Sequence, residues 1–210
     1  MRTESLYRQL DIRPGVTAVI GSGGKTTLLR QLCRELPGRV ILCTSTRIYP
    51  FEGLPLLTEP ISVLPREKVC MGSPAEEGKL SAPKQSFEEL AELADYVLVE
   101  ADGSRGLPLK AHLTHEPVIP ACAEQTVQVL GLSGLGRPIG EAAHRPEVYA
   151  RLCGGELETP VTAEMAAAVL KAENLCDRVL LNQADLADGR LLASLLDCSV
   201  VITALQPETR

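Results

Sequence analysis

The 210-residue sequence lacks several features that would place it in a specialised class of protein. Its seven cysteines include no C-x-x-C pair, so neither a disulfide framework nor a zinc knuckle is indicated. No apolar run is long enough to span a bilayer, and internal repeats and low-complexity tracts are absent. With 45% hydrophobic and 23% charged residues, the composition is typical of a soluble globular protein.

Positive charge is also scarce. Lysine and arginine total 21 against 27 aspartates and glutamates, for a formal net charge of −6. This balance argues against non-specific binding to nucleic acid or to an anionic membrane. The first residues, 1–4, lead into a mixed polar segment, so we expect no signal peptide. Several cysteines lie in or beside apolar segments, which favours buried thiols in a reducing cytoplasm.

Residues 16–20 are apolar and rich in β-branched side chains, and a phosphate-binding pattern follows them directly. This pattern consists of Gly21, Ser22, Gly23, Gly24, Lys25, Thr26 and Thr27, after which a helical pattern begins. Glycines let the backbone N–H groups curl around phosphate oxygens, and the N-terminus of the helix favours negative charge. We expect Lys25 to contact the β- and γ-phosphates and the Thr26 hydroxyl to bind Mg²⁺.

The match to the standard P-loop pattern is incomplete. That pattern has glycine where this chain has Val19, whereas the shorter form from Gly21 to Thr27 is intact. The short form resembles the loop of Mur-type ATP-dependent amide ligases as well as that of some GTPases. A glycine-rich turn with an unrelated lysine is the alternative.

A second apolar strand, expected at 96–99, ends in acidic residues. Glu100 and Asp102 follow it, with Gly103 next. An acid at the end of a buried strand is what holds Mg²⁺ beside the phosphates in P-loop proteins. We therefore expect Glu100 and Asp102 to be metal ligands and catalytic residues, and the N–H of Gly103 to contact the γ-phosphate. Acidic residues in an ordinary turn are the alternative.

Hydroxyl side chains follow the strand expected at 39–43. Because ligands bind at the carboxyl ends of strands in open α/β sheets, Thr44 and Thr46 are expected to reach the γ-phosphate or its metal. The alternative is a loop rich in capping hydroxyls.

The last two strands end in segments that resemble guanine-binding elements. Asn182, Gln183 and Asp185 resemble an N-K-x-D motif, and Thr203-Ala204-Leu205 takes the place of an S-A-[KL] element. Asp185 can accept from two guanine donors that adenine does not offer together. Asn182 is expected to tie this loop to the P-loop. The departure is Gln183, where lysine usually stacks on the base.

Some basic residues have open roles. His144 and Arg145 could stabilise transferred phosphoryl charge, bind an acidic partner or be surface charges. Arg105 and Arg145 are candidates for an arginine finger. His112 and His115 lack a convincing third ligand, so we favour no metal site there.

These features predict a P-loop NTPase-like, three-layer α/β/α fold with a mostly parallel sheet. We expect a single nucleotide-binding domain over residues 1–210. The segments 51–94 and 104–150 are expected to be irregular and are candidate partner-binding insertions. Short strands are expected near 61–63 and 68–71, and a flexible run is expected over 131–140.

Nearly the whole chain resembles the selenium-dependent hydroxylase accessory proteins, also called selenium cofactor biosynthesis proteins of the YqeC type. The resemblance rests on Gly21–Thr27, Thr44-Ser45-Thr46, Val97–Ser104, Lys110, His115-Glu116-Pro117, Gly131-Leu132-x-x-Leu135-Gly136 and His144-Arg145-Pro146-Glu147. It implies a cytoplasmic bacterial P-loop protein. The implied partner is a selenium-dependent molybdenum hydroxylase or one of its maturation factors.

Three functions remain open from sequence. The first is a slow Mg²⁺-dependent GTPase, or an ATPase, that serves cofactor maturation. The second is an ATP-dependent ligase or transferase that uses the Mur-like loop. The third is a non-catalytic nucleotide switch for a partner protein. A homodimer is expected only by analogy with maturation GTPases.

Overall fold

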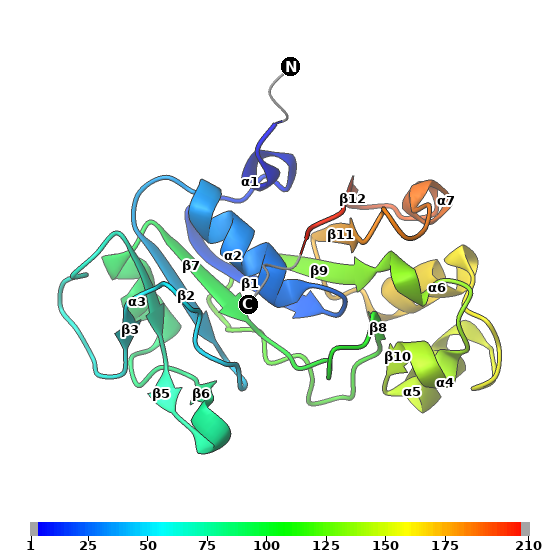
Figure 1. The fold of residues 1–210 in the computed structure, drawn as a ribbon, viewed down its shortest axis with the longest axis horizontal. Coiled ribbons are helices and arrows are strands. Elements are labelled where there is room, and N and C mark those ends of the chain that lie inside the picture. Colours follow the sequence, from blue (N-terminus) through cyan, green and yellow to red (C-terminus); the bar gives the residue numbers. More distant parts are fainter. Residues whose placement is uncertain (1–3, 207–210) are drawn as a thin grey trace. The chain divides into compact units, whose positions relative to one another are not determined.

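The computed structural model describes residues 4–206, so residues 1–3, on which the expectation about a signal peptide partly rests, lie outside it. Its main feature is an eight-stranded parallel sheet flanked by helices, with the strand order β12-β11-β9-β1-β7-β2-β4-β3 (Figure 1). The strands are β1 (Gly15–Gly21), β2 (Val40–Thr44), β3 (Leu56–Leu57), β4 (Lys68–Met71), β7 (Tyr96–Glu100), β9 (Gln125–Gly131), β11 (Arg178–Asn182) and β12 (Ser199–Ile202). The expected fold class, a P-loop NTPase-like α/β protein, is confirmed.

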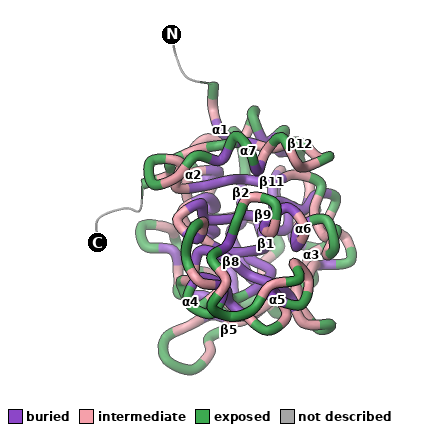
Figure 2. Tube along the Cα trace, turned by 90° about the vertical axis from the view of Figure 1, so that its right-hand side faces the viewer, coloured by how far each residue is buried: buried purple, intermediate pink, exposed green. Residues whose placement is uncertain are grey.

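The strands form where the sequence carries short, continuous apolar runs. Every residue of β2, β7 and β9 is buried, and Figure 2 shows β1, β9 and β11 as buried segments. Parallel strands covered by helices bury both faces, so such strands need apolar residues at successive positions rather than alternating ones. In the strand order β1 is central, with β7 and β9 as its neighbours.

The described chain forms two compact units. The first unit includes residues 4–19, 28–102 and 118–126, and the second includes residues 20–27, 103–117 and 127–206. Strand β1 and helix α2 (Lys25–Glu35) each contribute residues to both units. The expectation of a single domain stays a prediction.

In the first unit, helix α3 (Phe87–Leu93) packs on strands β1, β2, β4 and β7. Its buried Leu90 lies in a cluster with Ile41 and Val97. The helix begins with a capping box, in which Ser86 accepts from the Glu89 N–H and the Glu89 carboxylate accepts from the Ser86 N–H.

The segment 51–94 is more regular than expected. It contains β3, β4, β5 (Ser73–Pro74), the 3₁₀ helix η1 (Glu76–Gly78), β6 (Leu80–Ser81) and α3. The strand expected at 68–71 is confirmed, whereas the strand expected near 61–63 is wrong: those residues lie largely exposed in a bend, and Ile61 bonds to the side chain of Gln85 instead of to a strand.

In the second unit, a core of apolar side chains joins β9 and β11 to α4 (Ile139–Ala142), α5 (Pro146–Cys153), α6 (Ala163–Glu173) and α7 (Arg190–Ser194). Tyr149 on α5 and Leu132 are buried in this core. The flexible run expected over 131–140 is wrong, because Leu132 and Ile139 are buried in the core and hold the 3₁₀ helix η2 (Leu132–Gly134) and the start of α4 in place.

A two-residue parallel pairing lies in the segment expected to be irregular, 104–150. Strand β8 (Leu109–Lys110) pairs with β10 (Ala143–His144), and Lys110 is the register partner of His144. None of the helices in residues 4–206 has the length and apolar content needed to cross a membrane. A short helix, α1 (Leu6–Gln9), precedes β1.

Candidate functional site

The P-loop has a backbone conformation that requires glycine. Gly21, Gly23 and Gly24 have φ values of +90°, +83° and +130°, which L side chains rarely adopt. Space is also lacking, because a Cβ on Gly23 would collide with the backbone of Gly131, and one on Gly24 with the side chain of Asn182. The loop therefore lies tightly against the ends of β9 and β11.

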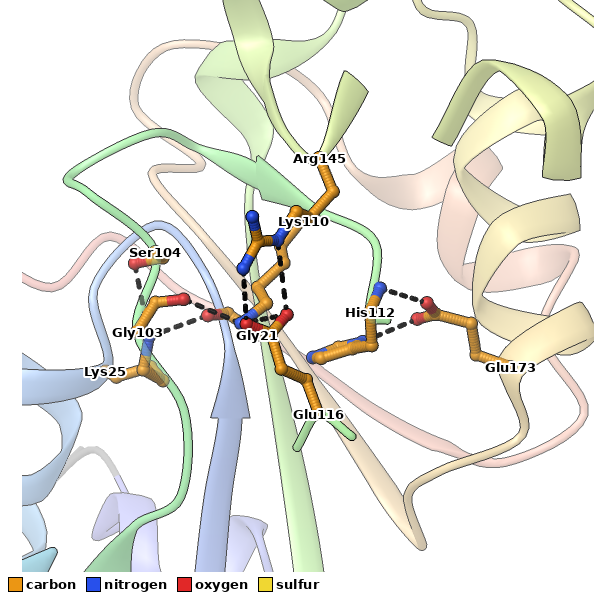
Figure 3. Close-up of polar contacts among 9 residues, drawn as sticks. All are labelled: Gly21, Lys25, Gly103, Ser104, Lys110, His112, Glu116, Arg145 and Glu173. Carbon is orange, nitrogen blue, oxygen red and sulfur yellow. Dashed lines mark hydrogen bonds and ion pairs between the residues drawn. The ribbon is translucent and has the colours of Figure 1, made fainter. Parts of the chain in front are cut away.

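Lys25 is the first residue of α2, and its ammonium group lies over the loop that precedes the helix. Its Nζ donates to the carbonyl oxygen of Gly21 at 2.7 Å and to the Oγ of Ser104 at 3.2 Å (Figure 3). The residue is buried, with 4% of its surface exposed. A buried ammonium is costly unless it is paired or hydrogen-bonded, and these two acceptors fix the direction of the Lys25 side chain.

A second buried lysine contacts the residue next to Ser104. The Nζ of Lys110 donates to the carbonyl oxygen of Gly103 at 2.6 Å, and 1% of its side chain is exposed. Lys25 and Lys110 thus hold the dipeptide Gly103-Ser104 from two sides (Figure 3). This dipeptide contains the glycine that the sequence assigned to the γ-phosphate.

Lys110 continues into an ion-pair cluster. Its Nζ lies 3.6 Å from Oε2 of Glu116, and Nη2 of Arg145 lies 2.7 Å from Oε1 of Glu116. Partial burial of Glu116 opposes ionisation, but the hydrogen bond from Arg145 and the charge of Lys110 outweigh it and lower the pKa of Glu116 to about 2. Arg145 has a left-handed backbone, with φ +65°, a conformation that is concentrated at functional sites.

His144 lies in the same cluster and is buried. Burial, followed by the charges of Lys110 and Arg145, lowers the pKa of its imidazole, which favours the neutral form. The interpretation of His144 as a surface charge is therefore wrong, because β10 places it inside the second unit. Arg145 is ion-paired with Glu116 and is partly exposed.

The segment after Lys110 is clamped by a single carboxylate. Glu173, the last residue of α6, accepts from the backbone N–H of His112 at 2.6 Å, and its other oxygen lies 2.9 Å from Nδ1 of His112 (Figure 3). Both side chains are buried, with 2% and 6% exposed. This clamp fixes β8 and so restricts where Lys110 can lie.

Asn182 links the P-loop to the end of the last strand. Its Nδ2 donates to the carbonyl oxygen of Gly23 at 2.8 Å, and its Oδ1 accepts from the N–H of Leu205 at 2.8 Å. The structural link expected of Asn182 is therefore present. The side chain of Gln183 accepts from Ser133 at 2.7 Å, and Asp185 is exposed. Thr203 lies beside this loop, since its carbonyl accepts from the N–H of Ala184.

Four further residues predicted from sequence, Thr44, Thr46, Glu100 and Asp102, belong to the first unit. Glu100, the last residue of β7, is the register partner of Val19 on β1 and of Thr44 on β2. The Oγ1 of Thr44 donates to the carbonyl of Glu100 at 2.7 Å and accepts from the N–H of Thr46 at 2.9 Å. Glu100 and Asp102 are both buried.

The donor set fits Mg²⁺ better than a metal held by protein ligands alone. Among residues 4–206, no three His, Cys, Asp or Glu side chains are grouped so as to hold a metal ion. Magnesium is usually bound by one or two carboxylates together with phosphate oxygens and water. Two buried acids of the first unit, Glu100 and Asp102, offer carboxylates of this kind.

Sequence reasoning missed three polar residues of the second unit as site residues: Ser104, Lys110 and Glu116. Lys110 and Glu116 were noted only as parts of the family resemblance. The available signal was a lysine in a short loop between two strand ends, but a lone lysine is usually exposed. Its burial depends on the pairing of β8 with β10, which joins residues 34 positions apart in the sequence.

A model of the YqeC protein family matches residues 17–147, well over half of the chain. The chain belongs to the YqeC protein family. It is 35% identical over 164 residues to a protein of Escherichia coli (strain K12) described as uncharacterized protein YqeC. That alignment covers 68% of this chain and 62% of the relative, so the chain spans less than two thirds of the relative's length. No solved structure matches the chain significantly.

Proposed function

We propose that this YqeC-family protein binds a nucleoside triphosphate with Mg²⁺ at Gly21–Thr27 and hydrolyses it slowly. The observation that carries the proposal is the placement of Lys25, whose buried Nζ lies on a loop of positive-φ glycines at the start of a helix. Backbone N–H groups, a lysine and a helix N-terminus together form an anion site suited to a chain of phosphates.

Each group of this site has a separate role. Lys25 neutralises the β- and γ-phosphates, and the loop backbone fixes their positions. From the sequence motifs, we expect Thr26 with Glu100 or Asp102 to hold Mg²⁺, which would neutralise charge on the phosphates. Thr44 or Thr46 is assigned to sensing the γ-phosphate. Arg145 is engaged by Glu116, so we expect fast turnover to need a partner.

GTP is proposed as the preferred nucleotide over ATP. Asn182 connects the P-loop to the backbone of Leu205, so it brings together the loop that binds phosphate and the segment assigned to the base. The exposed carboxylate of Asp185 lies three residues beyond Asn182 and can accept from two guanine donors. Ala204 is assigned to the backbone contact with the base.

The role in the cell is proposed from the family resemblance. We propose that the protein assists selenium cofactor biosynthesis in the cytoplasm, with a selenium-dependent molybdenum hydroxylase or one of its maturation factors as partner. Hydrolysis then serves as a timing step for that partner, as in other nucleotide switches.

Turnover measurements with the purified chain test this proposal. Phosphate release from Mg-GTP is measured for the wild type, for Lys25→Ala and for Lys171→Ala, an exposed lysine paired with Asp197, as the control. Slow release that is lost only in Lys25→Ala supports a GTPase. Release that requires a carboxylate acceptor would instead support a ligase, and binding with no release would support a non-catalytic switch. No binding of any nucleotide would contradict the proposal.

A further inference from the structure

The buried lysine Lys110 is the feature of the second unit that the nucleotide site proposed above does not use. Lysine is rarely buried to this extent, since 1% of its side chain is exposed. Its Nζ donates to the carbonyl of Gly103 and lies beside Glu116. These two contacts would be enough to stabilise a lysine that has only a structural role. Their position next to Ser104, which Lys25 contacts, indicates a further role for Lys110.

The dipeptide Gly103-Ser104 contacts both buried lysines. Lys25 donates to the hydroxyl of Ser104, and Lys110 to the carbonyl of the adjacent Gly103 (Figure 3). Residues adjacent along the chain have Cα atoms about 3.8 Å apart. The two ammonium groups therefore lie on neighbouring residues of one short segment, with the P-loop carbonyl of Gly21 bonded to one of them.

Lys110 also lies behind the P-loop itself. A small cavity of about 10 Å³ is lined by Lys110 and Gly21 together with apolar residues of β9, α5 and α6. Lys110 therefore lies beside a mainly apolar cavity, in which Gln128 is a polar lining residue, while its Nζ donates to the carbonyl of Gly103. Lysine stems commonly lie along apolar surface while the ammonium group reaches a polar region.

We infer that Lys110 is a second phosphate-binding lysine, which contacts the terminal phosphate of a bound nucleoside triphosphate. This inference rests on the proposed function. The carbonyls of Gly21 and Gly103 and the hydroxyl of Ser104 accept hydrogen bonds from the two lysines. A γ-phosphate takes over these donors, because a charge-assisted bond to a phosphate is stronger than one to a neutral carbonyl. A diphosphate reaches Lys25 and leaves Lys110 on Gly103.

The move of Lys110 from the carbonyl of Gly103 to a γ-phosphate would change the contacts of the Gly103-Ser104 segment. Once Lys110 moves from Gly103 to the phosphate, the Gly103-Ser104 segment is released and the ion pair of Lys110 with Glu116 is weakened. In the structure Nη2 of Arg145 lies 2.7 Å from Oε1 of Glu116. The carboxylate of Glu116 therefore still has Arg145 as an ion-pair partner after Lys110 moves. Triphosphate and diphosphate states then differ at Gly103-Ser104, as expected of a nucleotide switch.

The test compares affinities for a non-hydrolysable GTP analogue and for GDP, both with Mg²⁺, by calorimetry. In Lys110→Met, which keeps the stem but loses the charge, we expect affinity for the analogue to fall by about tenfold or more. Affinity for GDP should change by less than about twofold, which also shows that the variant is folded. Lys171→Met is the matched control and should change neither affinity.

Several outcomes would overturn the inference. Equal losses for analogue and GDP would show that Lys110 only supports the fold, and no loss would show that it does not contact phosphate. If the wild type binds neither nucleotide, the proposed function fails and this inference with it. If Lys110→Met does not fold, NMR replaces calorimetry. The wild type is labelled with ¹³C at the lysine Cε atoms, and the resonance of Lys110 is assigned as the one that is missing from Lys110→Arg. The signal must then shift with the analogue and not with GDP; an unchanged signal contradicts the inference.

Discussion

The amide Nδ2 of Asn182 donates a hydrogen bond to the carbonyl oxygen of Gly23 across 2.8 Å, joining the end of β11 to the middle of the P-loop. The same side chain accepts from the backbone of Leu205. One buried amide therefore fixes the relative positions of two backbone segments that are 182 positions apart in the sequence.

Replacing Asn182 should weaken both the fold and nucleotide binding. In Asn182→Ala the carbonyl of Gly23 and the N–H of Leu205 lose their partner, and we expect the free energy of unfolding to fall by about 1–3 kcal/mol. Asn182→Asp keeps the acceptor for Leu205 but loses the donor to Gly23, so GTP affinity should fall in both variants. Urea unfolding and calorimetry measure the two effects. If both variants bind GTP with the affinity of the wild type, the hydrogen bonds of Asn182 to Gly23 and Leu205 do not contribute to nucleotide binding.

Replacing Asp185 should change which base is preferred. Asp185→Asn presents an amide donor in place of one acceptor, so affinity should move from GTP towards xanthosine triphosphate. We expect a change of about ten- to a hundredfold in the ratio of the two affinities. Competition binding measures this ratio. A wild type that binds ATP and GTP equally, with a variant that behaves identically, would disprove guanine recognition.

Gly23 and Gly53 provide a matched pair of glycine substitutions. Their φ values, +83° and +81°, are nearly equal, but only Gly23 lies against other backbone, whereas nothing lies within 4 Å of a Cβ on Gly53. Gly53→Ala should therefore cost about 1–2 kcal/mol from its backbone conformation alone. Gly23→Ala should cost more and abolish nucleotide binding, because the backbone of Gly131 cannot give way. Equal losses in thermal unfolding would mean that close approach does not matter.

The carboxylate of Glu116 should make stability depend on pH. Its pKa is lowered to about 2 in the folded chain, so its contribution is fully present above about pH 4.5 and is lost as the pH falls towards 2. Lowering the pKa from 4.5 to about 2 corresponds to about 3–4 kcal/mol, an upper bound that solvent screening of this partly exposed group reduces. Glu116→Gln should flatten the fall in unfolding free energy between pH 5 and pH 3, whereas the exposed control Glu158→Gln should not. Parallel pH curves for wild type and Glu116→Gln would contradict this assignment.

Local signals in the sequence were sufficient for most of the framework. Continuous apolar runs at 16–20, 39–43 and 96–99 predicted the strands that the structure has as β1, β2 and β7. These features depend on residues a few positions apart, where spacing and side-chain chemistry decide the conformation.

Features that depend on distant residues could not be predicted. Helix α5 was not predicted because its N-cap is Arg145, in a left-handed conformation, and arginine lacks the short oxygen-bearing side chain that marks a helix start. The burial of Lys110 and the ion pair of Glu116 with Arg145 arise from the pairing of β8 with β10, which two-residue strands do not signal in sequence. The candidate site was therefore predictable along the P-loop and unpredictable in the cluster beside it.

The central claim is that the loop at Gly21–Thr27 binds a nucleoside triphosphate, and isothermal titration calorimetry tests it most directly. The purified chain is titrated with Mg²⁺ and a non-hydrolysable GTP analogue, then with the corresponding ATP analogue, and both titrations are repeated with Lys25→Ala. The account predicts saturable binding of one nucleotide per chain, tighter for the GTP analogue and lost in Lys25→Ala. Absence of binding to the wild type, or equal binding by Lys25→Ala in a folded state, would contradict it.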